Sequence, residues 1–187
     1  KTKNYLQGIF ESNDIPYSFK NITVTKDRDG NECEPSCFWC SWNRRNALFR
    51  HCVDNGYNKL ALGHHFDDIA ETILMNLVFH GTLESILPSR NFFDGAFDVI
   101  RPLFYLRERE IVRYANMAGF ISGTCTCTHA NDGKRKYMKK LVSEISHNSK
   151  SFHKNIWNAA QRWHETLGDH PLHKSEKILM KDRMNRY

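Results

Sequence analysis

The chain of 187 residues has no apolar run of the roughly eighteen residues that a membrane-spanning helix needs. It has no signal-like opening segment, no internal repeat and no low-complexity stretch. Six cysteines are too few for a small disulfide-stapled scaffold of the secreted type. We therefore expect a cytoplasmic protein without a membrane segment. In such a protein, paired cysteines more often serve metal binding or redox chemistry than structural cross-linking.

The remaining composition is that of an ordinary globular protein. Hydrophobic residues make up 40% of the chain and charged residues 26%. This length is enough for one domain with a sizeable core, or for most of one. The formal net charge of +6 favours an anionic partner.

Segments with strand and helix patterns alternate along the chain. The expected strands cover residues 22–24, 60–62 and 97–101. The expected helices cover residues 4–12, 44–55, 69–79 and 107–118, and residues 81–95 read as a long polar connection. Such alternation predicts an α/β fold with an open parallel sheet and helices on both faces. Gly63 and Arg101 should then lie at the same edge, where two parallel strands end.

The most informative segment is Gly63-His64-His65-Phe66-Asp67-Asp68, which follows a buried strand and opens a helix. Open α/β sheets bind their ligands at the carboxyl ends of the strands. Carboxylates at that position can hold Mg²⁺ against a nucleotide or accept a proton. The alternative is that Asp67 and Asp68 only cap the helix and favour its positive end. His64 could equally be a core histidine, and His65 a surface residue.

Two cysteine pairs stand far apart in the sequence. Cys37 and Cys40, at two-residue spacing, can both reach one metal ion. Cys125 and Cys127 lie in a Gly/Thr-rich loop and could complete the same site if the fold brings them over. A zinc site closed by all four cysteines is one possibility. Arg44-Arg45 follow the first pair and offer either phosphate contacts or a solvated helical turn.

The densest basic stretch lies near the carboxyl end. It consists of Lys134, Arg135, Lys136, Lys139 and Lys140. These side chains predict phosphate contacts with RNA, and a solvated helix face is the alternative. A helix-like segment follows, in which Trp157 and Trp163 stand six residues apart, so we expect at least one of them in the core.

The ordered set of motifs resembles the PP-loop ATP-pyrophosphatase superfamily and, within it, the tRNA 2-thiocytidine synthetases. The similarity spans roughly residues 5–145. The matching motifs are Cys37-x-x-Cys40-Ser41, Arg44-Arg45, Leu62-Gly63-His64-His65-x-Asp67-Asp68, Ile100-Arg101-Pro102-Leu103 with Arg107-Glu108, and the pair Cys125 and Cys127. Each motif alone is weak evidence, but together they occur in the family's order.

The resemblance implies an enzyme that thiolates a cytidine in the anticodon loop of tRNA. ATP would adenylate the C2 oxygen of the base with the help of Mg²⁺, and sulfur on the open iron of a [4Fe–4S] cluster would displace AMP. The implied ligands of the cluster are Cys37, Cys40 and Cys127, with Cys125 as the alternative third ligand. The implied nucleotide site is Gly63, His64, Asp67, Asp68 and Arg101, and the implied catalytic residues are Asp68, Cys37 and Cys40. The implied tRNA contacts are Arg44, Arg45 and the basic stretch. Further expected partners are a sulfur donor protein or sulfide, with a homodimer as one option for the assembly.

The sequence departs from the superfamily in one respect. The superfamily's phosphate loop, Ser-Gly-Gly-x-Asp-Ser, is missing, and no two glycines are adjacent anywhere in the chain. We expect residues 1–145 to be an α/β domain of PP-loop type without its amino-terminal part, and residues 146–187 to be a helical basic extension and tail. These 187 residues alone should then not release pyrophosphate from ATP. The alternatives are another PP-loop thiolase or ligase, acting on uridine or an amide, and a zinc-stabilised RNA-binding module without catalysis.

Overall fold

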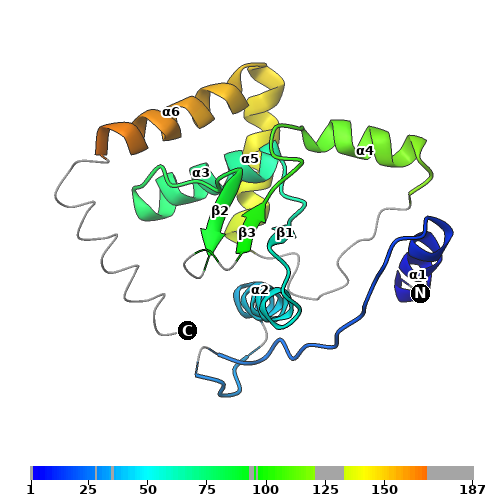
Figure 1. The fold of residues 1–187 in the computed structure, drawn as a ribbon. Coiled ribbons are helices and arrows are strands. Elements are labelled where there is room, and N and C mark those ends of the chain that lie inside the picture. Colours follow the sequence, from blue (N-terminus) through cyan, green and yellow to red (C-terminus); the bar gives the residue numbers. More distant parts are fainter. Residues whose placement is uncertain are drawn as a thin grey trace.

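The computed structural model describes residues 2–27, 29–34, 36–92, 95, 97–120 and 133–167. Its helices are α1 (Thr2–Ser12), α2 (Cys37–Asp54), α3 (Phe66–His80), α4 (Glu108–Met117), α5 (Lys134–Asn148) and α6 (Phe152–Leu167). Its strands are β1 (Lys59–Ala61), β2 (Ser89–Phe92) and β3 (Phe97–Ile100) (Figure 1). Cys125 and Cys127 lie outside the described residues. No helix within the described ranges is long and apolar enough to span a bilayer.

The strands form one small sheet in the order β1-β3-β2. β1 pairs in parallel with β3, with Leu60 opposite Val99, which confirms the predicted parallel pairing. β2 pairs with β3 in the antiparallel direction, although the sequence indicated a connection there. Three of its four residues are exposed, so this edge strand lacks the apolar alternation by which a strand is predicted.

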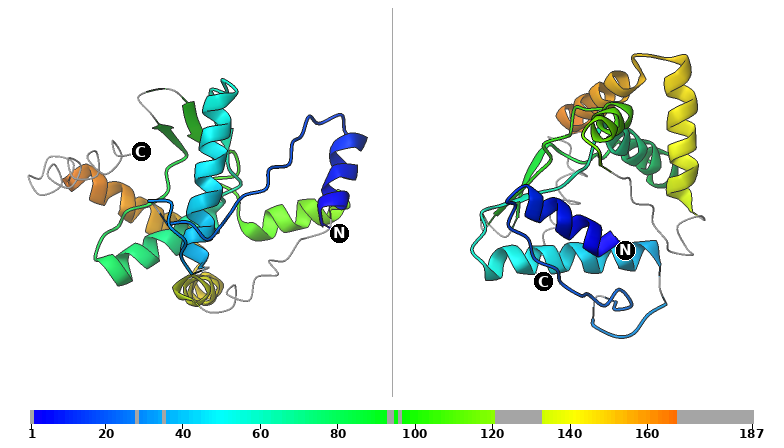
Figure 2. Two further views of the ribbon diagram at one scale, coloured as in Figure 1. Left: turned by 90° about the horizontal axis from the view of Figure 1, so that it is seen from below. Right: turned by 90° about the vertical axis from the view of Figure 1, so that its right-hand side faces the viewer.

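Helix α2 packs against the sheet. Phe49 and the buried Cys52 contact Phe97 and Val99, the two buried residues of β3. The burial of every second residue along β3 is the period-2 pattern of a strand with one face on a core. Figures 1 and 2 show α2 on one side of the strands and α3, α5 and α6 on the other.

The second core lies between α3, α6 and the segment after β3 that carries Phe104. Ile69 and Ile73 of α3 are fully buried with Phe104 and with Ala160 of α6. Trp157 packs against this cluster, whereas Trp163 is 37% exposed. The prediction that at least one tryptophan lies in the core is therefore confirmed. The predicted domain boundary after residue 145 falls within α5, and the division remains a prediction.

Two helices begin earlier than the sequence indicated. α2 begins at Cys37 and not near Arg44, because the Ser36 hydroxyl accepts a hydrogen bond from the Trp39 N–H at 3.2 Å and caps the helix. α3 begins at Phe66 and not at Ile69, with the Asp68 carboxylate accepting the His65 N–H at 3.1 Å. Both caps precede the apolar periodicity that the prediction used.

The expected strand at residues 22–24 is wrong. These residues form no strand, and the nearest pairing is an isolated bridge between Lys26 and Glu32. A strand needs a neighbour for its backbone N–H and C=O groups. Within the described part of the chain, no strand lies beside residues 22–24.

Candidate active site

The parallel strands place two predicted site residues at one edge of the sheet. Gly63 follows the end of β1 and Arg101 follows the end of β3, and the Leu62 N–H donates to the Ile100 carbonyl at 2.9 Å. The Nε–H of Arg101 donates to Nδ1 of His64 at 3.3 Å, and its Nη1 donates to the Leu87 carbonyl at 2.6 Å. Arg101 is thus anchored to the chain before β2 and orients His64.

His64 is held as a neutral imidazole. Burial lowers its pKa, and the neighbouring guanidinium groups of Arg101, Arg135 and Arg45 lower it further, against the opposing effect of Asp68. Because Arg101 donates to Nδ1, the proton of the neutral ring lies on Nε2. His64 can therefore donate one hydrogen bond from Nε2 to a ligand at this edge.

Asp67 joins three helices. Its carboxylate lies 2.9 Å from Nε2 of His153, and it accepts from Nε of Arg107 at 3.2 Å and from the N–H of Glu108 at 2.7 Å. Burial would raise the pKa of Asp67, but the hydrogen bonds from His153, Arg107 and Glu108 outweigh it and hold the pKa well below its ordinary value. Both oxygens are engaged, so Asp67 does not fit the role of a Mg²⁺ ligand. It ties the start of α3 to α4 and α6.

Asp68 has a different environment. One oxygen accepts the His65 N–H, and the other receives Nη2 of Arg135 at 2.6 Å. The side chain of Arg135 is 60% exposed, so this contact lies at the surface. Asp68 caps α3, as the alternative interpretation held. Of the two aspartates it is also the one that fits a metal site, since only a solvated side chain covers Oδ1.

Glu71 belongs to the site and was not singled out from the sequence. It is only 4% exposed, and its carboxylate lies 3.4 Å from Nε of Arg135. Burial raises its pKa to about 7, against the opposing charge of Arg135. The sequence could have indicated Glu71, because this acid lies one helical turn after Asp67 and Asp68 and between the core residues Ile69 and Ile73.

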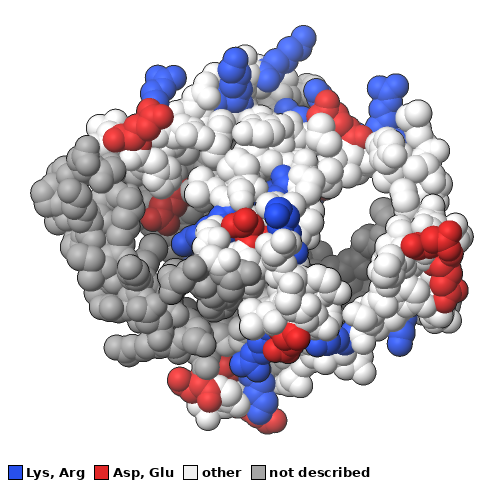
Figure 3. Space-filling view, in the orientation of Figure 1, with Lys and Arg blue, Asp and Glu red and all other residues white. Residues whose placement is uncertain are grey.

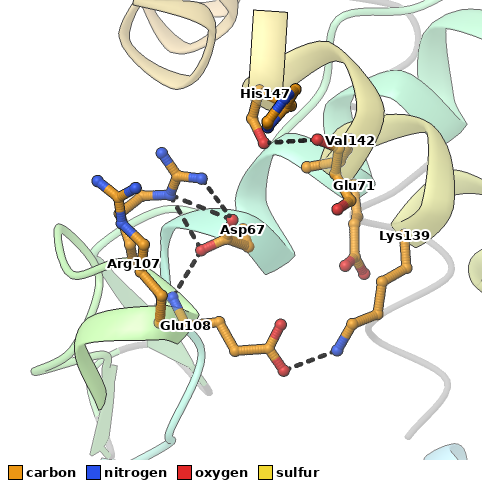
Figure 4. A pocket seen from close by; sticks show the side chains of 10 residues that line it. Asp67, Glu71, Arg107, Glu108, Lys139, Val142 and His147 are labelled. Atoms are coloured by element: carbon orange, nitrogen blue, oxygen red, sulfur yellow. Dashed lines mark hydrogen bonds and ion pairs between the residues drawn. The ribbon is translucent and has the colours of Figure 1, made fainter. Parts of the chain in front are cut away.

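Asp67 and Glu71 line a polar cavity of about 320 Å³ between α3, the start of α4 and α5 (Figure 4). Its lining consists of Asp67, Glu71, Arg107, Glu108, Arg109, Lys139, Val142, Ser143, Ser146 and His147. Nζ of Lys139 reaches Oε1 of Glu108 at 2.7 Å, and Figure 4 shows the Glu71 side chain beside Asp67, with its carboxylate toward this pair. The charges on the cavity wall are thus largely paired with one another.

The raised pKa of Glu71 predicts that this residue lowers the stability of the folded state as the pH rises. The folded state keeps this proton up to about pH 7, whereas an ordinary glutamate releases it near 4.5. Between these values the folded state binds more protons than the unfolded state, so this group lowers stability as pH rises. Glu71→Gln should therefore gain roughly 1–3 kcal/mol over the parent at pH 8 and little at pH 4.5, by urea unfolding. An equal gain at both pH values would contradict the assignment.

The basic stretch divides into inward and outward side chains. Arg135 and Lys139 pair with acids of α3 and α4, and Nζ of Lys134 lies 4.4 Å from the centre of the Phe79 ring. Lys140 is exposed and 3.8 Å from Glu144, and Lys136 has no ion pair with any of the described residues. Figure 3, seen from the direction of Figure 1, shows Lys and Arg scattered over the surface with Asp and Glu among them. Any RNA contact from α5 therefore rests mainly on the outward lysines.

Cys37 and Cys40 occupy the first turn of α2, and both are exposed. Residues three apart lie on one side of a helix, and a helix start stabilises thiolates, so the pair fits one side of a metal site. No group of three His, Cys, Asp or Glu residues in the described ranges could hold a metal. A third ligand must come from elsewhere, and both predicted candidates lie outside those ranges. Arg44 and Arg45 are exposed further along α2.

Comparisons with known proteins identify the family of this chain. Residues 6–122 match the PP-loop domain family. The chain is 38% identical over 125 residues to the tRNA-cytidine(32) 2-sulfurtransferase of Geobacter metallireducens, covering 66% of this chain and 49% of that protein. It is 34% identical over 153 residues to the protein of the same name from Syntrophotalea carbinolica, covering 76% and 58%. The chain thus spans about half the length of the curated relatives it matches.

A solved structure shares the fold. It is the U34-tRNA thiolase NcsA from Methanococcus maripaludis with its [4Fe–4S] cluster, at a TM-score of 0.64 and 22% identity. The match covers 85% of this chain and 54% of that one. At this identity the likeness shows the fold, whereas the family match covers more than half of the residues of this chain. The chain belongs to the PP-loop domain family.

Proposed function

We propose that the complete protein is an ATP-dependent tRNA thiolase, which replaces the C2 oxygen of an anticodon-loop cytidine with sulfur. Position 32, the position in the names of the relatives, is the target we infer. The observation that carries the proposal is the exposed Cys37–Cys40 pair at the start of α2. The same helix brings Arg45 close enough to His64 to influence its pKa, so it links the cysteines to the edge of the sheet.

The chemistry requires activation of a poor leaving group. The C2 oxygen of cytidine attacks the α-phosphorus of ATP and pyrophosphate leaves, which converts this oxygen into part of a phosphate ester. A hydrosulfide ion then bonds to C2 through its sulfur and loses its proton, the C2–O bond breaks, and AMP leaves. When bound, a [4Fe–4S] cluster on Cys37, Cys40 and Cys127, with Cys125 as the alternative third ligand, would supply the sulfur site, and Mg²⁺ at Asp68 would neutralise pyrophosphate charge.

In this proposal, the residues at the edge of the sheet bind and orient the nucleotide. Gly63 has open space within 4 Å of where a Cβ would lie, so it leaves room for a ligand beside the backbone. His64 donates a hydrogen bond from Nε2, and the hydrogen bond from Arg101 to Nδ1 fixes the orientation of the ring. Asp68 presents its carboxylate, while Asp67 holds α3 in place. A sulfur donor protein or sulfide completes the proposed reaction.

Release of pyrophosphate tests this proposal. The complete protein, prepared without oxygen, should release pyrophosphate from ATP when given unmodified tRNA, and should do so far more slowly without tRNA. Release that does not depend on tRNA would favour a PP-loop ligase acting on a small amide instead. Absence of release under all conditions, with tRNA binding intact, would favour the RNA-binding module.

The metal content gives a separate prediction. Protein purified without oxygen should be brown and contain iron, because two exposed cysteines at one helix start need only one more ligand for a cluster with an open iron. Cys37→Ser and Cys40→Ser should each lose most of the iron, as should Cys127→Ser, whereas Cys125→Ser should keep it. Iron and zinc are measured by elemental analysis. Stoichiometric zinc without iron, lost on replacing any of the four cysteines, would contradict the prediction and indicate a closed zinc site.

The outward lysines predict the salt dependence of tRNA binding. Replacing Lys136 and Lys140 together with alanine should weaken binding and lower the slope of log affinity against log salt by about two units, one for each lost phosphate contact. Lys150→Ala, at an exposed lysine just beyond the end of α5, serves as the matched control. Arg44 and Arg45 are further proposed contacts and are tested in the same way. Equal slopes for the double variant and the parent would show that α5 presents only a solvated face.

A further inference from the structure

Arg135 was predicted to contact RNA, but its guanidinium faces the carboxylates of α3. Its Nη2 lies 2.6 Å from Oδ1 of Asp68, and its Nε lies 3.4 Å from Oε2 of Glu71. Two nitrogens of one planar group thus engage two acids that are one helical turn apart. The contact joins the second residue of α5 to the first turn of α3, across 67 residues of sequence.

The other carboxylate oxygen of Asp68, Oδ2, is held from another direction. It accepts the backbone N–H of His65 at 3.1 Å. With a donor on each oxygen, the carboxylate cannot rotate freely about its bond to Cβ, and its plane is fixed relative to the sheet edge. Glu71, which is almost fully buried, in turn orients the guanidinium through Nε. Lysine could not do the same, because it carries one nitrogen on a flexible stem.

We propose that Arg135 is a positioning residue for the Asp68 carboxylate, with Glu71 as the buried anchor that aims it. The inference rests on the proposed function of this edge as the ATP-activating site. Arg135 then acts on the rate of the adenylation step and not on the affinity for RNA. This separates it from the outward lysines of the same helix.

The test compares variants of the complete protein in tRNA-dependent pyrophosphate release. Arg135→Ala should lower kcat by about 10- to 100-fold, the usual loss when a group that orients a metal or phosphate ligand is removed. The KM for tRNA and the salt slope of binding should stay at the parent values. Arg135→Lys should recover part of the rate, since its ammonium can reach only one of the two acids. Arg162→Ala, an exposed arginine of α6, is the matched control.

A kinetic result of the opposite kind would overturn the inference. If Arg135→Ala lowers the salt slope by about one unit and leaves kcat unchanged, Arg135 is an RNA phosphate contact. If its kcat equals that of Arg162→Ala, it has no positioning role. Because the Arg135 side chain is largely exposed, the variant should keep the melting temperature of the parent, so a loss of rate is not a loss of fold.

A second measurement keeps the inference independent of the proposed function. If the parent releases no pyrophosphate with any tRNA, the proposed function fails, and amide hydrogen exchange then tests the contact itself. Asp68→Asn should speed exchange in the first two turns of α5, because Arg135 loses its partner there. Unchanged exchange in α5 would contradict the coupling between these helices.

Discussion

Replacing Asp67 with alanine is expected to lower the free energy of unfolding by about 3–5 kcal/mol, the usual cost of removing one partner from a buried charged network. The variant would leave the guanidinium of Arg107 and the almost fully buried His153 without their shared acceptor, and the N–H of Glu108 without its partner. Three helices would lose their common contact at once. Urea unfolding at pH 7 measures the effect.

Two comparisons sharpen this prediction. Asp54→Ala, at the exposed end of α2, should change stability by no more than about 0.5 kcal/mol. The folded pKa of Asp67 lies below its ordinary value of 3.8, so its contribution is complete above that pH and is lost as the pH falls towards the folded pKa. The difference between Asp67→Ala and the parent should therefore shrink below about pH 4. A variant as stable as the parent at pH 7 would show that the network contributes nothing to the fold.

Replacing the neighbouring Asp68 with asparagine is expected to lower the reaction rate strongly and the free energy of unfolding only slightly. The amide oxygen of asparagine can still accept the His65 N–H and cap α3, and the lost ion pair with Arg135 is solvated, so stability should fall by no more than about 1 kcal/mol. The proposed function predicts that the rate of tRNA-dependent pyrophosphate release falls by about 100-fold or more, because the proposed Mg²⁺ ligand loses its charge.

The two aspartates thus serve as controls for each other. Asp68→Asn should unfold at nearly the same urea concentration as the parent but release pyrophosphate far more slowly. Asp67→Ala should unfold at a much lower urea concentration. An Asp68→Asn protein with the rate of the parent would reduce Asp68 to a helix cap. An Asp68→Asn protein as unstable as Asp67→Ala would place both residues in the structural network.

The sequence predicted the elements that carry strong periodicity. The strand at residues 60–62, the strand before Arg101 and the helix at 107–118 agree with the structure, because their apolar residues recur at the period of the element. The prediction failed at residues 22–24, where it placed a strand that does not form, and at β2, where it placed a connection, for opposite reasons. The first is apolar but has no neighbouring strand in the described part of the chain, and the second is a polar edge strand that its pairing with β3 stabilises.

The site was only partly visible in the sequence. The motif correctly predicted that Asp67 and Asp68 lie close to the edge of the sheet where β1 and β3 end. The spacing of residues along one helix cannot show which side chains of other helices bind these carboxylates. His153 reaches Asp67 from 86 residues away, and Arg135 reaches Asp68 from 67 residues away. Both contacts arise from the packing of α3 against α5 and α6, so they are tertiary and have no local signature.

The most direct test of the proposed function is the product itself. The complete protein, prepared without oxygen and given ATP, a sulfide source and unmodified tRNA, is incubated, and the tRNA is digested and its nucleosides are identified by mass spectrometry. We predict 2-thiocytidine, absent when ATP is omitted and absent from a tRNA in which the target cytidine is replaced with uridine. Thiolated uridine in place of 2-thiocytidine, or no thiolated nucleoside from protein that contains iron and binds tRNA, would contradict the account.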